Sequence, residues 1–586
     1  MKLMLAALNA KYIHTNLAIR YLGKTIDSLV DKLIINEYTI NHSTDYIMAE
    51  IYKQQPEVLC FSCYIWNMEM IHYLCRTLKK VMPETMIILG GPEVSYGTKE
   101  LMEENDAIDI VVIGEGEITF PALVKLLATN DDYSSLNGIA YRGRGAVYVN
   151  PPATDFVDMN MLPFPYDETI DDLDKIVYYE SSRGCPFNCQ YCLSSAQQGV
   201  RFLDVARVKE ELRFFLDKGV KQVKFVDRTF NANKRTAIEI MSFIKENNRG
   251  ITNFHFEVTA DILDEELLQF LESAPVGLFQ FEIGVQSTNP ETLKAIDRKM
   301  NFQRLKEVVE RIASYRNIHQ HLDLIVGLPH EDYFSFRKSF NDVFSLRPEK
   351  LQVGFLKLLK GSGLRADAQR YGYVYSDYAP YDILENDYLS YGELLRLKGI
   401  EEMVEIYWNS RVFNTAMEVL LHNFYSNTLS FFEDLWRYWE KKGHQHTSHN
   451  KNRLYEILIE FYISKEFPLI DAFKEVLKLD YYKNTKTSSL PAFFIKSDEA
   501  DLKNKSHEFL QKQENIESYI PKYVGQPAKQ IIKKVHFQQF QYDVIEIEQS
   551  PEIFNCLEPK RITVLFDYDL DNKAIDFSKY YAIKLD

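Results

Sequence analysis

Three cysteines on one short loop constrain this chain more than any other feature. Cys185, Cys189 and Cys192 are spaced C-x3-C-x2-C, and they follow Ile176–Tyr179, an apolar run typical of a strand. Three thiolates so close together suit a metal centre, and no fourth cysteine follows at a compatible spacing. A cuboidal [4Fe-4S] cluster held by three thiolates keeps one iron open, and an open iron can bind a substrate or a cofactor.

The loop also carries Tyr191 directly before its last cysteine. In spacing and in this aromatic residue it resembles the motif of the radical S-adenosylmethionine (radical SAM) enzymes. The resemblance implies a [4Fe-4S] cluster on Cys185, Cys189 and Cys192, and S-adenosylmethionine bound at the open iron with Tyr191 beside it. It further implies a 5′-deoxyadenosyl radical that abstracts hydrogen from an unactivated carbon, and an external electron donor such as flavodoxin or ferredoxin.

Length and composition set outer limits on the molecule. A chain of 586 residues is too long for one core and should hold two to four domains. Its net charge of −16 argues against a large nonspecific nucleic-acid footprint. No run of about 18 apolar residues exists, so no membrane span is expected. Seven cysteines, three of them clustered, indicate no disulfide framework and a reducing cytoplasm as the location.

Residues 1 to about 130 alternate between short apolar runs and amphipathic stretches. Strands are expected at 3–8, 33–40, 58–64, 86–89 and 108–113, with helices between them. This pattern predicts a doubly wound parallel sheet, whose ligands bind beyond the carboxyl ends of the strands. Glycines fall at those ends: Gly90 and Gly91 after the fourth strand, and Gly114 after the fifth. They could simply make tight turns, or they could let a bulky ligand approach the backbone.

The order of these segments favours the second interpretation. ILGGPEVS, then DIVVIGEGEITF, upstream of a radical SAM cysteine loop, resembles the cobalamin-binding domain of B12-dependent radical SAM enzymes. The resemblance covers residues 1–150. It implies that the nucleotide tail of cobalamin lies near Ser62, Gly90, Gly91, Gly114 and Glu115.

The sequence departs from that family at the cobalt ligand. Many cobalamin domains carry D-x-H-x-x-G after the first strand, whereas this chain has His14 without the aspartate and without the glycine. Because metal-bound histidines need a partner that polarises them, a corrinoid held without a histidine is the favoured interpretation. Ligation by His14 and a domain that binds no cobalamin are left open. Cys60 and Cys63, three apart on an expected strand, should point to opposite faces and be structural.

A second set of alternating strands and helices follows from residue 176. Strands are expected at 176–182, 222–226, 254–258, 279–285, 321–326 and 350–355, with helices between them. Six such units are too few for a closed eightfold barrel. They match the partial (β/α)6 barrel of the radical SAM enzymes, with the active site at the carboxyl ends of the strands.

Polar residues stand at the ends of these strands. The series resembles the oxygen-independent coproporphyrinogen oxidase branch of the radical SAM superfamily. The resemblance implies that Glu257 and Arg298 handle the charged methionine end of S-adenosylmethionine, and that Gln286 and Asp323 bind its ribose hydroxyls. Asp227 occupies the place of a segment that contacts the methionine amino group, although the usual Gly-Gly-Glu is absent. Taken singly, each of these residues could be a structural ion pair or a solvated strand end.

The remaining residues form an accessory region. We expect an α/β protein with a cobalamin-binding-like domain at 1–150, a linker at 151–175, a radical SAM barrel at 176–375 and a C-terminal domain at 385–586. The last is predicted to be mostly helical, with a small β lobe of strands at 531–539, 543–547, 562–566 and 580–585. It resembles the uncharacterised C-terminal domain of a branch of B12-binding radical SAM proteins.

The sequence leads to one main hypothesis and two alternatives. The main one is a radical SAM enzyme that binds S-adenosylmethionine and cobalamin and methylates an unactivated carbon of an unknown substrate. Within the same class, a radical cyclisation, rearrangement or oxidation is the alternative. From a different class, a noncatalytic iron–sulfur or zinc protein is considered, but zinc would require a fourth ligand near the loop.

Overall fold

A computed structural model of the chain describes residues 1–153, 156–168, 173–196, 199–487, 490–494, 499–569 and 578–585. The chain divides into two compact units. The first comprises Met1–Gln320, Ile325–Tyr333 and Gly354–Tyr391, and the second comprises His321–Leu324, Phe334–Val353 and Gly392–Asp586. The four predicted domain ranges differ from this division and stay a prediction. Residues 154–155 and 169–172 of the predicted linker lie outside the described residues.

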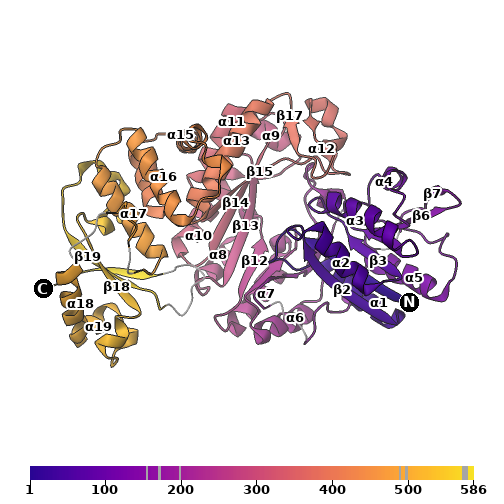
Figure 1. The fold of residues 1–586 in the computed structure, drawn as a ribbon, viewed down its shortest axis with the longest axis horizontal. Helices are drawn as coiled ribbons and strands as arrows, with labels where there is room; N and C mark the ends of the chain where they lie inside the picture. Colours follow the sequence, from indigo (N-terminus) through magenta and orange to yellow (C-terminus); the bar gives the residue numbers. More distant parts are fainter. Residues whose placement is uncertain are drawn as a thin grey trace. The chain divides into compact units, whose positions relative to one another are not determined.

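The N-terminal part is a seven-stranded sheet in the order β2-β1-β3-β4-β5-β6-β7 (Figure 1). The first five strands pair in parallel, as the sequence pattern predicts. The antiparallel strands β6 and β7 extend the sheet as a hairpin. The strands are β1 Lys2–Asn9, β2 Lys32–Thr39, β3 Val58–Ser62, β4 Met86–Gly90, β5 Ile110–Val112, β6 Ile139–Gly143 and β7 Ala146–Val149.

Apolar cores cover both faces of this sheet, which confirms the doubly wound fold. Alternate strand residues such as Leu3 and Cys60 pack under helices α1 and α5, whereas Met4 and Cys63 belong to the core under α2, α3 and α4. Cys60 and Cys63 therefore point to opposite faces, as expected of a strand. The helices are α1 Leu17–Ile26, α2 Thr44–Gln54, α3 Met68–Val81, α4 Thr98–Glu104 and α5 Gly116–Thr129.

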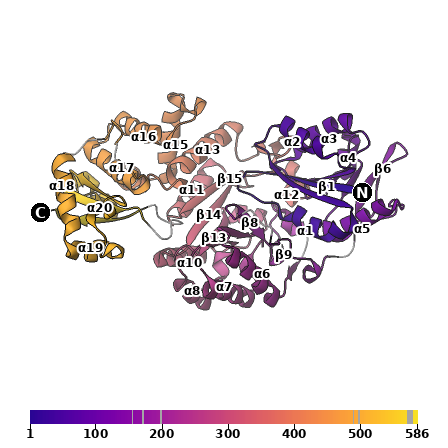
Figure 2. The same ribbon diagram turned by 60° about the horizontal axis from the view of Figure 1, so that its bottom comes forward.

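The second sheet has six strands in the order β15-β14-β13-β12-β11-β8 (Figure 2), a linear order that does not close into a barrel. The predicted partial (β/α)6 arrangement is thereby confirmed. Its strands are β8 Ile176–Tyr179, β11 Gln222–Phe225, β12 Asn253–Glu257, β13 Phe279–Gln286, β14 His319–Val326 and β15 Lys350–Phe355. The helices between them are α6 Val205–Lys218, α7 Lys234–Asn247, α8 Glu265–Glu272, α9 Pro290–Ala295, α10 Phe302–Tyr315 and α11 Tyr333–Phe344.

Burial alternates strictly along four strands of this second sheet, β8, β11, β13 and β14. In β13, Phe279, Phe281, Ile283 and Val285 are buried, while the intervening residues are partly exposed. Since successive strand residues face opposite sides, the apolar set packs under the helices and the polar set lines the other face. One face of the barrel sheet therefore carries most of its polar side chains.

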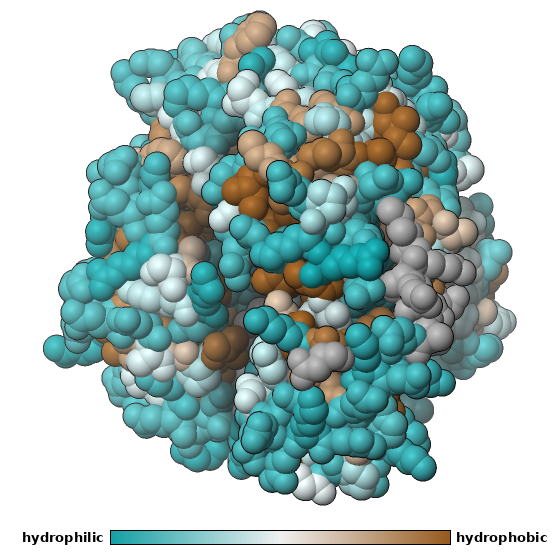
Figure 3. All heavy atoms as spheres, turned by 90° about the vertical axis from the view of Figure 1, so that its left-hand side faces the viewer, coloured by the Kyte–Doolittle hydropathy of each residue, from teal (hydrophilic) through white to brown (hydrophobic). Residues whose placement is uncertain are grey.

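The second unit is helical with a small antiparallel sheet, β18-β19-β20, as predicted in outline. Its main elements are α13 Tyr391–Met403, α14 Asn414–Asn423, α15 Thr428–Lys441, α16 Lys451–Ser464, α17 Ile470–Asn484, α18 Glu499–Gln511, α19 Gln513–Tyr519, β18 Val535–Phe540, β19 Ile562–Asp567 and β20 Lys579–Ile583. Figure 3 shows a face of the molecule on which hydrophilic side chains predominate and hydrophobic ones appear mainly in recesses.

One predicted strand of this lobe is wrong. The segment 543–547 belongs to helix α21 Val544–Gln549, not to a strand. Asp543 caps the helix by accepting a hydrogen bond from the Glu546 backbone N–H, and Val544 and Ile547 are buried three residues apart. That spacing is typical of a helix. So short a segment fits both the helical and the strand pattern of burial, and the N-cap hydrogen bond identifies it as a helix.

No helix in the described part of the chain has the length and apolar character needed to cross a membrane.

Candidate functional site

Gly184 lets the start of the cysteine loop pack closely against a neighbouring strand. The loop leaves strand β9, Ser182–Cys185, which pairs with β10, Gly199–Phe202, in antiparallel register. Gly184 has a φ of +103°, and a Cβ there would lie 2.2 Å from the Gly199 carbonyl oxygen. Only glycine fits a left-handed backbone pressed so closely against another strand.

The middle of the loop is fixed by backbone hydrogen bonds from two sides. The Gln190 N–H donates to the Ile296 carbonyl at 2.9 Å, and the Gln190 carbonyl accepts from the Leu364 N–H at 2.9 Å. Cys189 is buried, while Cys185 and Cys192 are partly exposed. Among the described residues, no group of three or more Cys, His, Asp or Glu side chains is placed to hold a single metal ion. A cuboidal cluster differs, because each thiolate binds a different iron.

Arg298 contacts both the buried Cys189 and Tyr191, a residue predicted to bind S-adenosylmethionine. Its Nη1 donates to the Cys189 Sγ at 3.7 Å and to the Tyr191 hydroxyl at 3.2 Å, and its Nη2 donates to the Gly284 carbonyl. Burial raises the pKa of the Cys189 thiol, and the guanidinium opposes that shift. The structure thus brings Tyr191 and Arg298 together beside the cysteine loop.

The other predicted S-adenosylmethionine residues lie on the polar side of the barrel strands. Gln286 ends β13 with a φ of +71°, and its buried Oε1 has no hydrogen-bond partner among the described residues. Glu257 ends β12, and burial raises the pKa of its carboxyl. An orphaned acceptor and a partly buried carboxyl fit a ligand that carries hydroxyls and an ammonium. Asp323 lies partly exposed on β14.

The carboxylate of Asp227 is hydrogen-bonded within the protein. The carboxylate is buried, and it accepts hydrogen bonds from the Ser181 backbone N–H at 2.9 Å and from the hydroxyls of Ser181 and Ser182 at 2.5 and 2.6 Å. Burial raises the pKa of Asp227 to about 7. The side chain therefore positions the strand that leads into the cysteine loop. Its contact with the methionine amino group stays a prediction.

Sequence reasoning missed an ionic cluster on the polar face of the barrel. The Glu282 carboxylate accepts a hydrogen bond from Lys224 at 2.8 Å and lies 3.0 Å from the His255 Nε2. Although burial opposes it, His255 and Lys224 hold the pKa of Glu282 below its usual range. Strand alternation could have indicated this cluster. The strand sequences QVKF, NFHFE and FQFEIGVQ carry polar residues at most alternate positions, so these residues share one face of the sheet.

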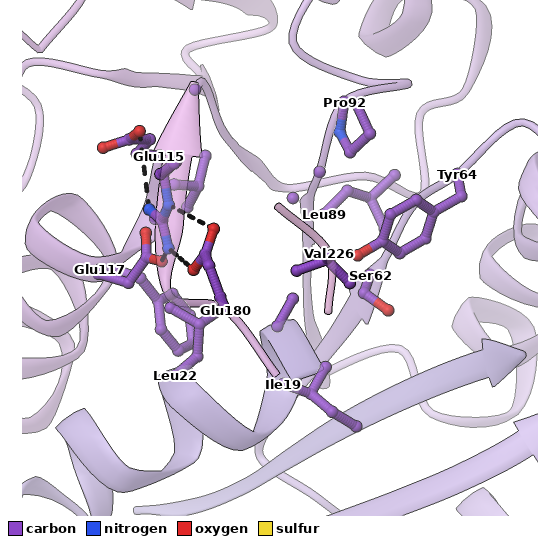
Figure 4. Close-up of a pocket in the computed structure, with 18 of the residues that line it drawn as sticks. Ile19, Leu22, Ser62, Tyr64, Leu89, Pro92, Glu115, Glu117, Glu180 and Val226 are labelled. Carbon is purple, nitrogen blue, oxygen red and sulfur yellow. Dashed lines mark hydrogen bonds and ion pairs between the residues drawn. The ribbon is translucent and has the colours of Figure 1, made fainter. Parts of the chain in front are cut away.

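A cavity of about 380 Å³ lies between the N-terminal sheet and the cysteine-loop strand (Figure 4). All five residues predicted for the cobalamin tail line it: Ser62, Gly90, Gly91, Gly114 and Glu115. Residues from the other side also line it, namely Ser182, Arg183, Gly184, Leu193, Ser194, Val226 and Arg228. The cavity sits at the carboxyl ends of β3, β4 and β5, the place where doubly wound sheets bind ligands.

The glycines of this cavity fit a ligand that approaches the backbone. Gly114 has a φ of +81°, and a Cβ there would meet no atom of the described chain within 4 Å, so the residue borders open space. Gly91 has a φ of +118°, and a Cβ would lie 2.5 Å from the Cys63 carbonyl oxygen. Together with apolar lining such as Phe61, Leu89 and Phe120, the site fits the large and mainly apolar face of a corrinoid.

Glu115, predicted as a cobalamin contact, is engaged by arginine. Arg201 donates to both of its carboxylate oxygens, and Arg183 lies 3.6 Å from one of them. Burial works against ionisation, but the two guanidiniums keep the pKa of Glu115 below its usual value. Arg183 also donates to Glu117 at 2.7 Å and to both oxygens of Glu180 (Figure 4).

His14 lies apart from the residues that line this cavity. Its Nδ1 is hydrogen-bonded to the Tyr178 hydroxyl at 2.5 Å, and burial lowers the pKa of the imidazole. The interpretation without a histidine ligand to cobalt stays a prediction.

Three family models match successive parts of the chain. Residues 4–124 match the B12 binding domain, residues 179–343 match the radical SAM superfamily, and residues 369–566 match the protein of unknown function DUF4080. The fold and these matches define a radical SAM enzyme with an N-terminal B12-binding domain. Within that class, the C-terminal part of this chain, residues 369–566, matches DUF4080. The class implies a [4Fe-4S] cluster, S-adenosylmethionine and cobalamin as cofactors.

Characterised and uncharacterised relatives share about half of the chain. An uncharacterised methyltransferase of Pyrococcus horikoshii is 28% identical over 324 residues, which are 54% of this chain and 70% of that protein. The 2-(S-pantetheinyl)-carbapenam-3-carboxylate methyltransferase of Streptantibioticus cattleyicolor is 28% identical over 309 residues, 48% of this chain and 44% of the enzyme. The cobalamin-dependent radical SAM methyltransferase TokK of Streptomyces tokunonensis is 26% identical, over 53% of this chain and 48% of its own.

Solved structures share the fold at low sequence identity. The cobalamin-dependent S-adenosylmethionine radical enzyme OxsB superposes with a TM-score of 0.57 at 13% identity, over 86% of this chain and 82% of that one. The radical S-adenosylmethionine methyltransferase TsrM of Kitasatospora setae superposes with a TM-score of 0.54 at 15% identity, over 65% and 80%.

Proposed function

We propose that this protein is a cobalamin-dependent radical SAM methyltransferase that methylates an unactivated carbon of its substrate. The observation that carries the proposal is the shared cavity of about 380 Å³, lined on one side by strand ends of the B12-binding domain and on the other by the cysteine-loop strand. Methyl transfer and radical formation must meet at one substrate carbon, and this arrangement supports that meeting. Relatives named as methyltransferases support it as well.

When bound, the three cofactors supply the radical and methyl-transfer chemistry, and the protein supplies binding and orientation. The cluster would be held by Cys185, Cys189 and Cys192. S-adenosylmethionine would be bound by Tyr191, Glu257, Gln286, Arg298, Asp323 and Asp227, and cobalamin by Ser62, Gly90, Gly91, Gly114 and Glu115. Apolar side chains around the cavity would exclude water, which would otherwise compete for reactive species.

A radical cyclisation, rearrangement or oxidation is the second candidate. It is favoured by one comparison, because the anaerobic magnesium-protoporphyrin IX monomethyl ester cyclase of a Synechocystis strain is 28% identical over 262 residues, 42% of this chain. That relative shares the class but is not named as a methyltransferase. Both candidates use the same cysteine loop, so only the fate of the methyl group separates them.

Anaerobic reconstitution with iron, sulfide and hydroxocobalamin tests the proposal. A chemical reductant would replace the expected flavodoxin or ferredoxin. We expect methyl-labelled S-adenosylmethionine to yield S-adenosylhomocysteine and labelled bound cobalamin, and reduction to yield 5′-deoxyadenosine. Formation of 5′-deoxyadenosine without S-adenosylhomocysteine would favour the second candidate. A colourless protein that holds one zinc ion would refute both.

Cysteine variants supply the control for this experiment. Cys185→Ala should abolish cluster binding, as measured by iron content and visible absorbance. Cys556→Ala, an exposed cysteine in the second unit, should leave both unchanged. Equal iron content in the two variants would contradict the assignment of the loop.

A further inference from the structure

Arg228 is an arginine at the cavity that no group in the described part of the protein binds. It follows β11 directly, is exposed, and lines the cavity between the B12-binding domain and the cysteine-loop strand. Among the described residues, none forms a hydrogen bond or an ion pair with its guanidinium. An arginine carries five N–H donors in a planar fork, so this side chain presents all of them to the cavity or its solvent.

The other charged residues of the cavity are bonded to one another. Glu115 is held by Arg201, and Glu117 and Glu180 are held by Arg183 at 2.7 and 2.8 Å. Their charges and hydrogen-bonding groups are largely satisfied within the protein. Arg228 differs from this cluster, because its donors are directed to no carboxylate of the described chain.

The surroundings of Arg228 place it between the two halves of the predicted site. Its positive charge acts on Glu257, at the end of β12, where burial raises the pKa and Arg228 opposes the rise. It acts in the same way on Tyr64 in the B12-binding domain, whose pKa burial raises to about 12. Tyr64 also lines the cavity and stacks on Trp66 at 4.4 Å. Arg228 thus lines the cavity close enough to a predicted S-adenosylmethionine residue and to the B12-binding domain for its charge to act on both.

We propose that Arg228 binds a carboxylate or phosphate group of the substrate, so that the substrate of this enzyme is an anion. This inference rests on the proposed function. A guanidinium is the side chain that matches the geometry of a carboxylate or phosphate with two parallel hydrogen bonds. The carboxylate of S-adenosylmethionine already has a predicted partner in Arg298, which lies beside Cys189 and Tyr191.

Chemical modification with phenylglyoxal, which reacts with accessible guanidiniums, tests the proposal on the reconstituted holoenzyme. The rate at Arg228 would be followed by peptide mass spectrometry, with saturating S-adenosylmethionine and hydroxocobalamin present throughout. We expect succinate or inorganic phosphate to slow the reaction at Arg228 by about tenfold. Arg316, an exposed arginine without a partner among the described residues, should react at an unchanged rate.

Two further arms separate the sources of the anion. If S-adenosylmethionine alone protects Arg228, the residue binds the methionine carboxylate and the proposal is overturned. If hydroxocobalamin alone protects it, the residue binds the phosphate of the nucleotide tail, which also overturns the proposal. Absence of protection by both succinate and phosphate would overturn it too.

A binding measurement gives an independent check. The holoenzyme with Arg228→Gln should bind radiolabelled inorganic phosphate about tenfold more weakly than the wild type, whereas Arg316→Gln should not differ from it. Equal affinity in the two variants would contradict the proposal. Neither experiment requires turnover, so the outcome of each is independent of the outcome of the methyl-transfer assay.

Discussion

The guanidinium of Arg183 lies 2.7 Å from the carboxylate of Glu117. Arg183 stands two residues before the first cysteine of the loop, and Glu117 lies in the first turn of α5 in the B12-binding domain. The side chains of both residues are largely buried. This ion pair therefore joins the strand that carries Cys185, the first predicted cluster ligand, to the helix that follows the glycines predicted to contact cobalamin.

We expect Arg183→Gln to destabilise the protein by about 3 kcal/mol, because it leaves Glu117 and Glu180 largely buried without their cation. Cobalamin affinity should fall as well, since the cavity loses its cross-connection. Urea unfolding and titration with hydroxocobalamin measure the two effects. Lys209→Gln breaks a more exposed pair with Glu239 and should cost less than about 1 kcal/mol. Similar losses in both variants would contradict the structural role of Arg183.

Gly184→Ala should lower the iron content after anaerobic reconstitution. It should also destabilise the protein by several times the cost of placing an alanine in the left-handed backbone region, which is about 1 to 2 kcal/mol. The added Cβ would overlap the Gly199 carbonyl, so β9 and β10 would have to separate. Gly250→Ala is a matched control, since Gly250 also has a positive φ, of +74°, but a Cβ there meets no atom of the described chain within 4 Å. Equal iron content and stability in both variants would show that the overlap is relieved without effect.

The buried carboxyl of Asp227 makes stability depend on pH. Its pKa is raised to about 7 in the folded protein, above the ordinary value of 3.8, so the folded state holds a proton that the unfolded state has lost between these values. The stabilisation is complete below about pH 4 and is lost as the pH rises through about 7. From this group alone, the free energy of unfolding falls by at most about 1.4 kcal/mol per pH unit in that window.

Asp227→Asn should remove this dependence, because the amide keeps an acceptor for the Ser181 N–H and can donate to the serine hydroxyls. Unfolding free energies measured from pH 5 to pH 8 should decline less in Asp227→Asn than in the wild type. Asp106→Asn, a substitution at an exposed aspartate, should follow the wild type. A parallel decline in all three proteins would mean that Asp227 does not titrate in this range.

Arg298→Lys should weaken the binding of S-adenosylmethionine by about tenfold or more while the cluster is retained. A lysine cannot reach the Cys189 sulfur, the Tyr191 hydroxyl and the Gly284 carbonyl together, because it lacks the planar fork of donors. Equilibrium dialysis of the reconstituted protein measures the affinity. Arg304→Lys on α10, where the side chain bonds Glu307 and the Leu263 carbonyl, is the control. Unchanged affinity in Arg298→Lys would remove this residue from the predicted site.

The features that the sequence alone determined are local ones. Cys185, Cys189 and Cys192 lie within a few residues of one another, and Gly90 and Gly114 lie at or just after the ends of β4 and β5, so spacing and periodicity were enough to locate the cysteine loop and the strand-end glycines. The two sheets were predicted for the same reason, since alternation within a strand is a property of neighbouring residues. The cofactors were implied by the resemblance to cobalamin-dependent radical SAM enzymes. The wrong strand at 543–547 shows the limit, because so short a segment fits both periods.

Only the tertiary structure decided which distant residues meet. Asp227 lies 46 residues from Ser181, yet its carboxylate accepts a hydrogen bond from the backbone N–H of that residue. The contact of Glu282 with Lys224 and the ion pair of Arg183 with Glu117 join separate strands and helices in the same way. Such pairings depend on how whole elements pack. The sequence does not show whether the partner of a charged residue is another side chain, solvent or, as we propose for Arg228, a substrate.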